Sequence, residues 1–218
     1  MKQSKQYSLD HLDNKESWRL FKILAEFVEG FSNLSDLGPC VSIFGSARSA
    51  PDSALYKETE QLAAALARAG YGIISGGGPG LMEAANKGAK EAGGVSVGLH
   101  IHLPLEQEAN SYMNVRCAFN YFFVRKVMFV KYAMAYVAMP GGAGTVDEVI
   151  EAFVLAQTKR IRPFPIILYK RNYWEGLLDW MRSSMIEQNF ISEEELASLI
   201  ILDTPEEVVA TIKRMVVL

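Results

Sequence analysis

The sequence is poor in cysteine and has no strong excess of charge of either sign. Its two cysteines, Cys40 and Cys117, lie far apart and lack the spacing of a metal site. A formal net charge of −3 gives no global basic field, so no nucleic-acid partner is expected. No apolar run approaches the roughly 18 residues of a membrane span, and residues 1–6 lack the apolar core of a signal peptide. We therefore expect a cytoplasmic protein with no membrane partner.

The sequence does have enough apolar material for one sizeable core, since 50% of its 218 residues are hydrophobic. No internal repeat or linker indicates a second unit. We expect a flexible N-terminus over residues 1–14 and a single domain over residues 15–218. This domain should begin with a helix over residues 15–34, where Trp18 and Phe21 start a series of apolar residues at helical spacing.

Short apolar segments of strand length alternate with segments of helical periodicity along the rest of the chain. The strand candidates are residues 41–44, 72–74, 95–101, 135–139, 164–169 and 199–202. Near-continuous apolar strands between helices predict a parallel sheet that is covered on both faces. We expect a Rossmann-like α/β fold, a doubly wound parallel sheet flanked by helices, with ligands bound beyond the carboxyl ends of the strands.

Three glycine-containing turns, at residues 45–48, 75–80 and 140–145, directly follow strand candidates. The carboxyl ends of parallel strands meet at one edge of a sheet, so the three turns should converge on one crevice. A strand, a glycine turn and a helix start bring free backbone N–H groups to one place, which suits an anion such as phosphate. The candidate binding residues in these turns are Ser46, Arg48, Gly77, Gly78, Gly141, Gly142, Gly144 and Thr145.

The third turn allows two interpretations. In the first, Thr145 lies near the N-cap of the following helix and Glu148 lies on its first turn, close to the bound anion. In the second, Thr145 and Glu148 form a capping box, because Thr-x-x-Glu is also the pattern in which two side chains satisfy each other's backbone N–H groups. The turn taken alone does not decide between them.

Other kinds of site find little support. None of the turns has the Gly-x-Gly-x-x-Gly pattern, and no Gly-x-x-x-x-Gly-Lys-Ser/Thr occurs, so neither a dinucleotide nor a triphosphate-hydrolysing loop is expected. His100 and His102 could ligate a metal from one face of a strand, but no third ligand is indicated and a surface pair is the favoured interpretation. We expect no metal and no cofactor; no lysine stands in a context that favours pyridoxal phosphate.

Two longer motifs resemble those of the LONELY GUY family. They are Gly76-Gly77-Gly78-Pro79-Gly80-Leu81-Met82-Glu83, continuing to Ala89, and Pro140-Gly141-Gly142-x-Gly144-Thr145-x-x-Glu148, with Arg125-Lys126 between them. Family members are phosphoribohydrolases that activate cytokinins, and many long carried the label "lysine decarboxylase". The similarity covers residues 38–200 and is closest to the longer bacterial members.

The resemblance implies a nucleotide-binding domain that hydrolyses the N-glycosidic bond of a nucleoside 5′-monophosphate to free base and ribose 5-phosphate. AMP and cytokinin riboside 5′-monophosphates are both implied as substrates. The implied catalytic pair is Arg125 and Glu148, and Lys126, in the same Arg-Lys motif, is expected to contact the substrate. Glu83 either contacts the base or sugar or only complements the dipole of its own helix.

A non-catalytic carrier of a nucleotide or of molybdenum cofactor is the alternative, because carrier proteins are similar in fold and also hold phosphate with glycine turns. A carboxylate beside a phosphate favours hydrolysis, since a pure carrier gains little from it. The family and the apolar surplus on the helix over residues 15–34 imply a homodimer or a dimer-based hexamer.

Overall fold

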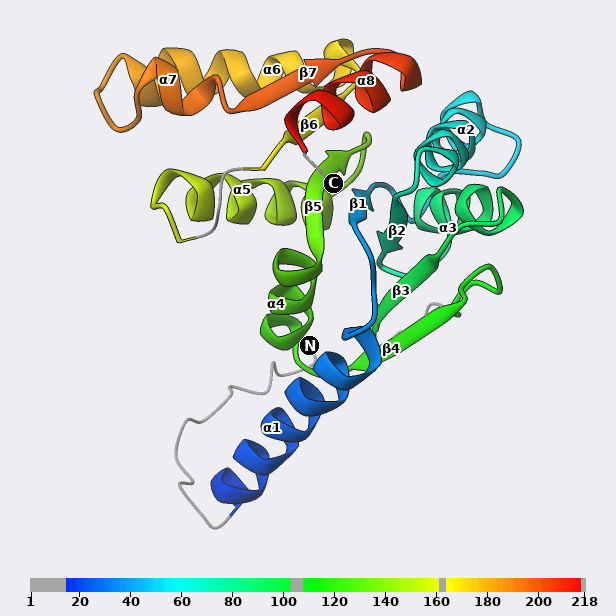
Figure 1. The fold of residues 1–218 in the computed structure, drawn as a ribbon. Coiled ribbons are helices and arrows are strands. Elements are labelled where there is room, and N and C mark those ends of the chain that lie inside the picture. Colours follow the sequence, from blue (N-terminus) through cyan, green and yellow to red (C-terminus); the bar gives the residue numbers. More distant parts are fainter. Residues whose placement is uncertain (1–14, 103–107, 161–163, 217–218) are drawn as a thin grey trace, which may run out of the picture.

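The computed structural model describes residues 15–102, 108–160 and 164–216, in which seven parallel strands form one sheet (Figure 1). Their order is β4-β3-β2-β1-β5-β6-β7. The strands are β1 (Cys40–Phe44), β2 (Gly72–Ser75), β3 (Ser96–Ile101), β4 (Val115–Phe119), β5 (Ala133–Ala138), β6 (Ile166–Tyr169) and β7 (Leu199–Leu202). The predicted doubly wound α/β fold is confirmed, whereas the N-terminus predicted to be flexible, residues 1–14, lies outside the described residues.

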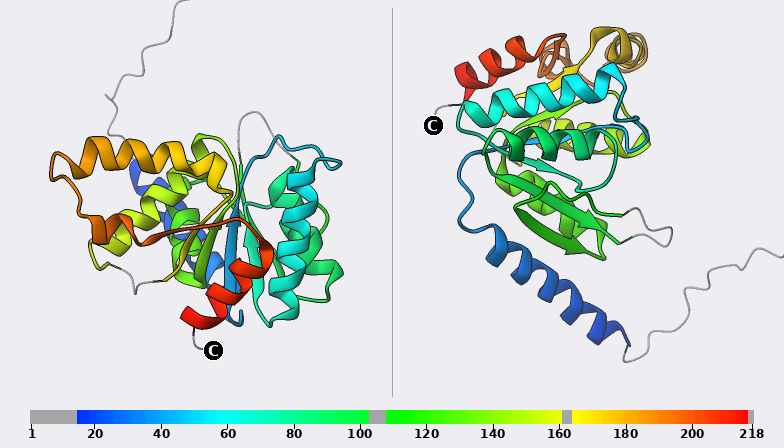
Figure 2. Two further views of the ribbon diagram at one scale, coloured as in Figure 1. Left: turned by 90° about the horizontal axis from the view of Figure 1, so that it is seen from above. Right: turned by 90° about the vertical axis from the view of Figure 1, so that its right-hand side faces the viewer.

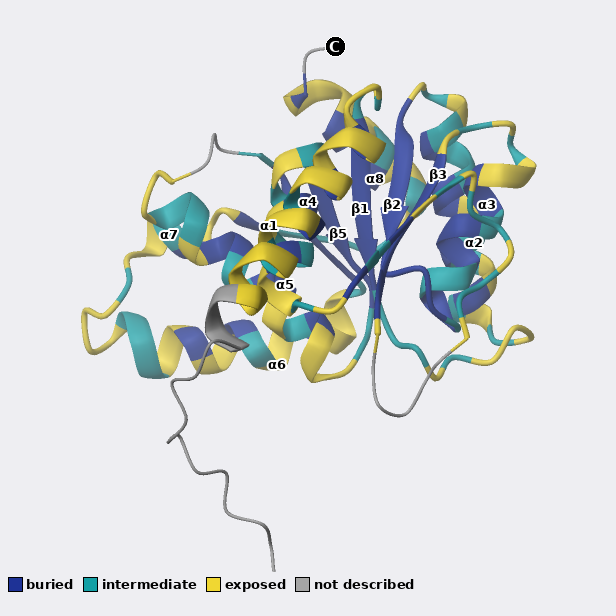
Figure 3. Cartoon of the chain, turned by 90° about the horizontal axis from the view of Figure 1, so that it is seen from below, coloured by how far each residue is buried: buried dark blue, intermediate teal, exposed yellow. Residues whose placement is uncertain are grey.

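Helices cover both faces of the sheet (Figures 2 and 3). They are α1 (Lys15–Leu34), α2 (Ala54–Arg68), α3 (Leu81–Glu91), α4 (Phe122–Tyr132), α5 (Ala143–Gln157), α6 (Arg171–Met181) with a π-helical turn (Arg182–Ile186), α7 (Glu193–Leu196) and α8 (Pro205–Met215). One core joins α2, α3 and α8 to the sheet and includes Leu62 and Ile212. The other joins α4, α5 and α6 and includes Phe129 and Trp174. The sheet is therefore buried on both faces, as parallel sheets require.

The edge strand β4 was missing from the sequence-based prediction. It pairs with β3, with Val97 opposite Val115 and Ile101 opposite Phe119. Only Cys117 and Phe119 of its five residues are buried, so it lacks the continuous apolar run that marks the central strands. Pairing with a neighbour, rather than a local pattern, makes this segment a strand.

Helix α1 spans Lys15–Leu34, and it carries an apolar face that the described part of the chain leaves exposed. Ile23 and Phe27 pack against the core. Trp18, Phe21 and Val28 are 70%, 61% and 67% exposed. In the right-hand view of Figure 2, α1 extends away from the body of the domain. This helix thus has one side seated on the domain and another that faces solvent.

The sheet reverses its winding direction between β1 and β5. From β1 the chain proceeds outward through β2 and β3 to β4, and then returns to place β5 on the other side of β1. The turns after β1, β2 and β5 meet beyond this switch point and are bonded to one another. The Ser46 N–H donates to the Pro140 carbonyl (3.1 Å), and the Leu81 N–H donates to the Ser46 carbonyl (2.9 Å). These two backbone hydrogen bonds, both made by Ser46, hold the three turns together.

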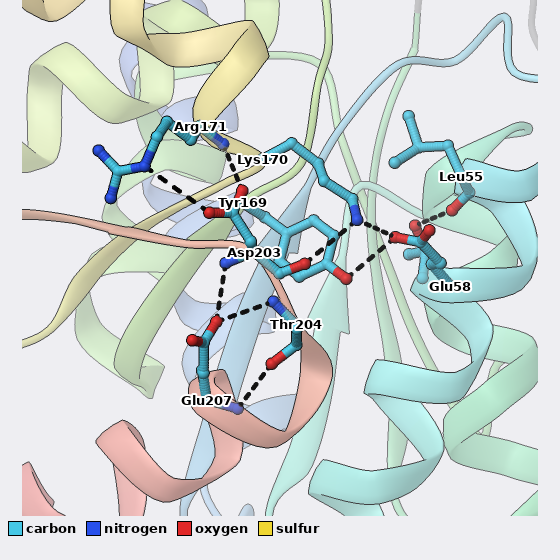
Figure 4. Close-up of polar contacts among 9 residues, drawn as sticks. Leu55, Glu58, Tyr169, Lys170, Arg171, Asp203, Thr204 and Glu207 are labelled. Carbon is cyan, nitrogen blue, oxygen red and sulfur yellow. Dashed lines mark hydrogen bonds and ion pairs between the residues drawn. The ribbon is translucent and has the colours of Figure 1, made fainter.

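A polar network lies at the carboxyl ends of β6 and β7 (Figure 4). Glu58 of α2 accepts a hydrogen bond from the Tyr169 hydroxyl (3.0 Å) and pairs with the Lys170 ammonium (2.8 Å). Lys170 also donates to the Asp203 carbonyl (3.1 Å), and its backbone has the left-handed φ of 79°. The network ties the start of α2 to the ends of two strands. It thereby anchors the segment that enters α2, which carries Arg48.

Candidate active site

A cavity of about 550 Å³ lies at the switch point. It is bounded by the turns after β1, β2 and β5, by the end of β3 and by α4 and α5. The lining residues are Phe44, Gly45, Ser46, Ala47, Arg48, Gly76, Gly78, Met82, His100, Ile101, Phe122, Arg125, Gly142, Ala143, Gly144, Thr145 and Glu148. The predicted convergence of the three glycine turns on one crevice is confirmed.

The helix start at this cavity differs in register from the prediction. The N-cap of α5 is Gly142, so Thr145 lies within the first turn and Glu148 on the second. No side chain caps Gly142, and the Thr145 N–H instead donates to the Gly142 carbonyl (2.9 Å). The capping-box interpretation is therefore wrong. As the first two residues of the helix, Ala143 and Gly144 have N–H groups with no acceptor inside it, and both residues line the cavity.

Close packing requires glycine at position 141. A Cβ atom there would lie 2.2 Å from the Thr145 hydroxyl oxygen and 3.0 Å from the Ser46 nitrogen. The Gly141 carbonyl accepts a hydrogen bond from the Tyr173 hydroxyl of α6. These contacts bring the turn after β5 against the turn after β1, and they hold the start of α5 at the cavity. The helix dipole and the free amides make this the natural place for an anion.

Glu148 is the carboxylate of the cavity, and it is only 6% exposed. Its Oε2 atom is buried and has no hydrogen-bond partner among the described residues. Burial raises the pKa of Glu148 from 4.5 to about 7, against the opposing effect of the Lys126 and Arg125 charges. The carboxyl group therefore exchanges its proton near neutral pH, as an acid–base or charge-stabilising group needs to do.

Arg125 is held in the cavity by its own hydrogen bond and by a glycine. Its Nε donates to the Leu99 carbonyl of β3 at 2.7 Å, and the guanidinium carbon lies 5.1 Å from the centre of the Phe129 ring. A Cβ atom on Gly76 would lie 2.5 Å from Arg125 Nη2. Burial lowers the pKa of Arg125 and Glu148 opposes this effect, but a guanidinium stays charged. Arg125 is thus a fixed cation within electrostatic range of Glu148.

The second glycine turn is held by a buried polar network that local motifs do not reveal. The Gly77 N–H donates to Ser75 Oγ (3.0 Å), which in turn bonds Asn86 Oδ1 (2.6 Å). Asn110 donates its backbone N–H to the Gly77 carbonyl (2.9 Å) and its side-chain amide to the Gly78 carbonyl (3.0 Å). The Gly77 amide is therefore engaged within the protein. This turn forms a rigid wall, and Gly76 and Gly78 supply its cavity-facing part.

Four predicted binding residues lie outside the cavity lining: Gly77, Glu83, Lys126 and Gly141. Glu83 Oε1 accepts a hydrogen bond from the Tyr56 hydroxyl at 2.8 Å. Lys126 pairs with Asp147 (2.8 Å) and Glu151 (3.2 Å) of α5. Lys126 still acts on the cavity, because its charge lowers the pKa of Glu148. The predicted residues that do line the cavity are Ser46, Arg48, Gly78, Arg125, Gly142, Gly144, Thr145 and Glu148.

His100 also lines this cavity, although it was not among the predicted binding residues. The residue is 5% exposed and lies near the carboxyl end of β3, the edge at which the cavity opens. Its position near the carboxyl end of a predicted strand could have indicated that it lines the cavity. The His100 and His102 rings meet edge to face with centroids 5.8 Å apart.

Within the described ranges, no group of three His, Cys, Asp or Glu residues could hold a metal ion, and no helix is long and apolar enough to cross a membrane.

Fold and site together define a Rossmann-like α/β protein with a ligand cavity at its switch point, where a buried carboxylate and a guanidinium lie near a helix N-terminus. Residues 82–212 match the protein family described as "Possible lysine decarboxylase". The match spans more than half of the chain. The chain belongs to this family, which is the LONELY GUY family that its motifs resemble.

The chain is also similar to individual proteins and solved structures. The cytokinin riboside 5′-monophosphate phosphoribohydrolase of Mycobacterium marinum is 25% identical over 146 residues, which are 66% of this chain and 78% of that protein. A structural genomics target solved by X-ray crystallography has a TM-score of 0.61 and 27% identity, over 82% of this chain and 100% of that chain. The molybdenum cofactor binding protein of Rippkaea orientalis has a TM-score of 0.58 and 21% identity, over 82% of this chain and 98% of that chain. The last likeness is one of fold.

Proposed function

We propose that the protein hydrolyses the N-glycosidic bond of a nucleoside 5′-monophosphate, either AMP or a cytokinin riboside 5′-monophosphate, to free base and ribose 5-phosphate. The observation that carries the proposal is the buried Glu148 carboxyl, which lines one cavity with Arg125 and the first turn of α5. The family and the name of the Mycobacterium marinum relative support the same reaction.

The start of α5 would bind the 5′-phosphate of the substrate. The free amides of Ala143 and Gly144 and the positive end of the helix dipole suit a phosphate group, and the Thr145 hydroxyl lies in the same turn. Anchoring the phosphate fixes the position of the ribose in the cavity. Binding energy from this remote group is thereby used to orient the scissile bond.

Glu148 would act on the ribose as its bond to the base breaks. The C1′–N bond cleaves with its electron pair going to the base, which leaves an oxocarbenium-like sugar with positive charge near C1′. The Glu148 carboxylate stabilises that charge and accepts a proton from the water whose oxygen bonds C1′. The base takes up a proton from solvent, and Glu148 releases to solvent the proton that it accepted from the attacking water. Arg125 lies within electrostatic range of Glu148 and favours its ionised form.

The direct test is incubation of the protein with AMP and, separately, with an isopentenyladenosine 5′-monophosphate while free base is followed by chromatography. Release of adenine or isopentenyladenine together with ribose 5-phosphate is the expected result, and the faster substrate gives the base preference. Nucleotide binding without release of any base would contradict the proposal and support the carrier alternative. That alternative draws on the likeness to molybdenum cofactor binding proteins, which is a likeness of fold.

The pH dependence should follow the ionisation of Glu148. Because the carboxylate is the active form and its pKa is raised to about 7, kcat/KM should rise between pH 6 and pH 8 and then level off. The control is Lys126→Met, which removes a charge that lowers this pKa and should move the midpoint to higher pH. Titration of the substrate phosphate is the same for both proteins. A midpoint that stays in place in Lys126→Met would show that another group is being titrated.

Gly76→Ala is expected to lower kcat about tenfold while the fold persists, because it displaces a catalytic group. The added Cβ would lie 2.5 Å from both Arg125 Nη2 and Met82 Sδ, which are ends of flexible side chains that can move. The measurement is kcat together with the midpoint of thermal unfolding. Gly176→Ala is the matched control, since nothing lies within 4 Å of that position. An unchanged kcat in Gly76→Ala would mean that the position of the guanidinium does not matter.

We further propose that the protein is a cytosolic homodimer or a dimer-based hexamer. The side chains of Trp18 and Phe21 on α1 and of Phe122 and Phe123 at the start of α4 are 48–70% exposed. Large apolar side chains exposed on two helices that pack together fit a second copy of the chain. Sedimentation of the wild-type protein and of Phe21→Lys tests this assembly.

A further inference from the structure

We infer that Glu26, on α1, is a positioning residue for Arg125, acting through the N-terminus of α4. The inference rests on the proposed function, in which the charge of Arg125 favours the ionised form of Glu148. It gives α1 a part in the site, although none of the α1 side chains that the structure describes lines the cavity. The two residues are far apart in the sequence, and the contact between them runs through the segment that starts α4.

Glu26 caps a helix to which it does not belong. The N-cap residue of α4 is Tyr121, and no side chain of α4 itself provides a cap. Glu26 Oε1 and Oε2 each accept the Asn120 N–H at 3.1 Å, and Oε1 also accepts the Asn120 side-chain amide at 2.7 Å. Oε2 additionally accepts the Tyr121 N–H at 3.3 Å. One carboxylate therefore satisfies the backbone donors that lead into the helix.

The capped segment is the turn that carries Arg125. The Arg125 N–H donates to the Tyr121 carbonyl at 3.2 Å, so this residue stands one turn beyond the capped position. Its side chain meets the Leu99 carbonyl at 2.7 Å and leaves no room for a Cβ on Gly76. Movement of the Arg125 backbone would draw the guanidinium away from the Leu99 carbonyl. A shift of the first turn of α4 would be passed directly to the catalytic cation.

A cap supplied from another element fixes position as well as stability. A serine or aspartate at position 121 would cap the helix locally, by accepting a hydrogen bond from the N–H of residue 123 or 124. Such a cap would leave α4 free to move relative to its neighbours. Glu26 instead ties α4 to α1, and it is buried, at 8% exposure, where a carboxylate is costly unless well bonded.

Further contacts seat α1 along α4. A Cβ on Gly30 would lie 2.7 Å from the Met128 methyl carbon, so the two helices approach closely one turn beyond Glu26. The Tyr132 hydroxyl donates to the Phe31 carbonyl at 3.4 Å near the other end of α4. Glu26 thus bonds the first end of α4, whereas the Gly30–Met128 and Tyr132–Phe31 contacts hold the rest of the helix against α1. Loss of the carboxylate should release the first turn of α4 and leave its last turn in place.

The test compares Glu26→Gln with Glu29→Gln, which removes the same charge from an exposed position on the same helix. Glu26→Gln is expected to lower kcat for base release about tenfold with KM changed by less than about twofold, because Arg125 shifts and the phosphate site on α5 does not. Glu29→Gln should match the wild type. An equal loss of kcat in both variants, an unchanged kcat in Glu26→Gln, or a loss that only tracks the folded fraction would overturn the inference.

Amide hydrogen exchange separates this inference from the proposed function. In Glu26→Gln, exchange should accelerate at Asn120, Tyr121 and Arg125, whose N–H groups bond Glu26 or the first turn of α4, and stay at the wild-type rate at residues 129–132 and in α5. If the wild-type protein releases no base, the proposed function fails while this local change still supports the capping role. Uniform acceleration, or none, overturns the capping role whatever the activity.

Discussion

Glu148→Gln is expected to slow the release of adenine from AMP by about 10²–10³, because it removes the charge that stabilises the oxocarbenium-like sugar. Glutamine has nearly the same shape, so nucleotide binding at the start of α5 should persist. The effect should therefore appear in kcat, with KM close to the wild-type value. Single-turnover chromatography of free base, with ribose 5-phosphate as the second product, measures it.

The same substitution should stabilise the fold at alkaline pH. Burial raises the pKa of Glu148 from 4.5 to about 7, so the folded protein binds this proton more tightly than the unfolded chain does. The buried charge therefore costs stability as pH rises from 4.5 through 7, and above pH 7 the full cost applies. Glu148→Gln should raise the free energy of unfolding at pH 8 by about 1–3 kcal/mol and change it little at pH 4.

Asp147→Asn is the matched control for both effects. It removes one negative charge from the neighbouring position of α5, where the side chain is 57% exposed, and Lys126 keeps its other partner, Glu151. Its turnover and its stability should stay near the wild-type values. If Glu148→Gln releases adenine at the wild-type rate, the carboxylate has no part in bond cleavage and the proposed mechanism is wrong.

The sequence predicts the central features of the fold because they depend on local patterns. Buried parallel strands are short apolar runs, and the turns that follow them contain the glycines that the cavity requires. The strand β4 was not predicted, because it lies at the edge of the sheet and only its Cys117 and Phe119 are buried. Local patterns therefore identify the buried strands and the edge at which the cavity opens, but not every member of the sheet.

The predicted site residues divide according to how their contacts arise. Thr145 and Glu148 line the cavity because the helix that follows β5 brings them there, although the helix begins earlier than its Thr-x-x-Glu pattern suggested. The partner of Glu83, Tyr56, comes from another element, and so do Asn86 and Asn110, which bond Ser75 Oγ and the Gly77 carbonyl and hold the second turn. Such long-range hydrogen bonds decide whether a group is available to a ligand, and no spacing within one motif reveals them.

Arg125→Lys is expected to lower kcat about 10²-fold even though a basic residue remains, because lysine cannot reproduce the fork of a guanidinium. Arg125 uses its Nε for the Leu99 carbonyl and still presents its terminal nitrogens beside Gly76. A single ammonium can take only one of these places. Burial also lowers the pKa of a lysine far more readily than it removes the charge of an arginine, so the variant partly loses its cation.

The pH profile identifies what Arg125 does. Its charge lowers the pKa of Glu148, so a weakened cation in Arg125→Lys should move the midpoint of kcat/KM to higher pH as well as reducing kcat. Arg116→Lys, at an exposed position on β4, is the control and should change neither quantity. If Arg125→Lys raises KM while kcat and the midpoint stay unchanged, the guanidinium is a phosphate ligand and Glu148 is positioned without it. A joint change in kcat and midpoint instead makes Arg125 and Glu148 one electrostatic unit, with phosphate binding left to the start of α5.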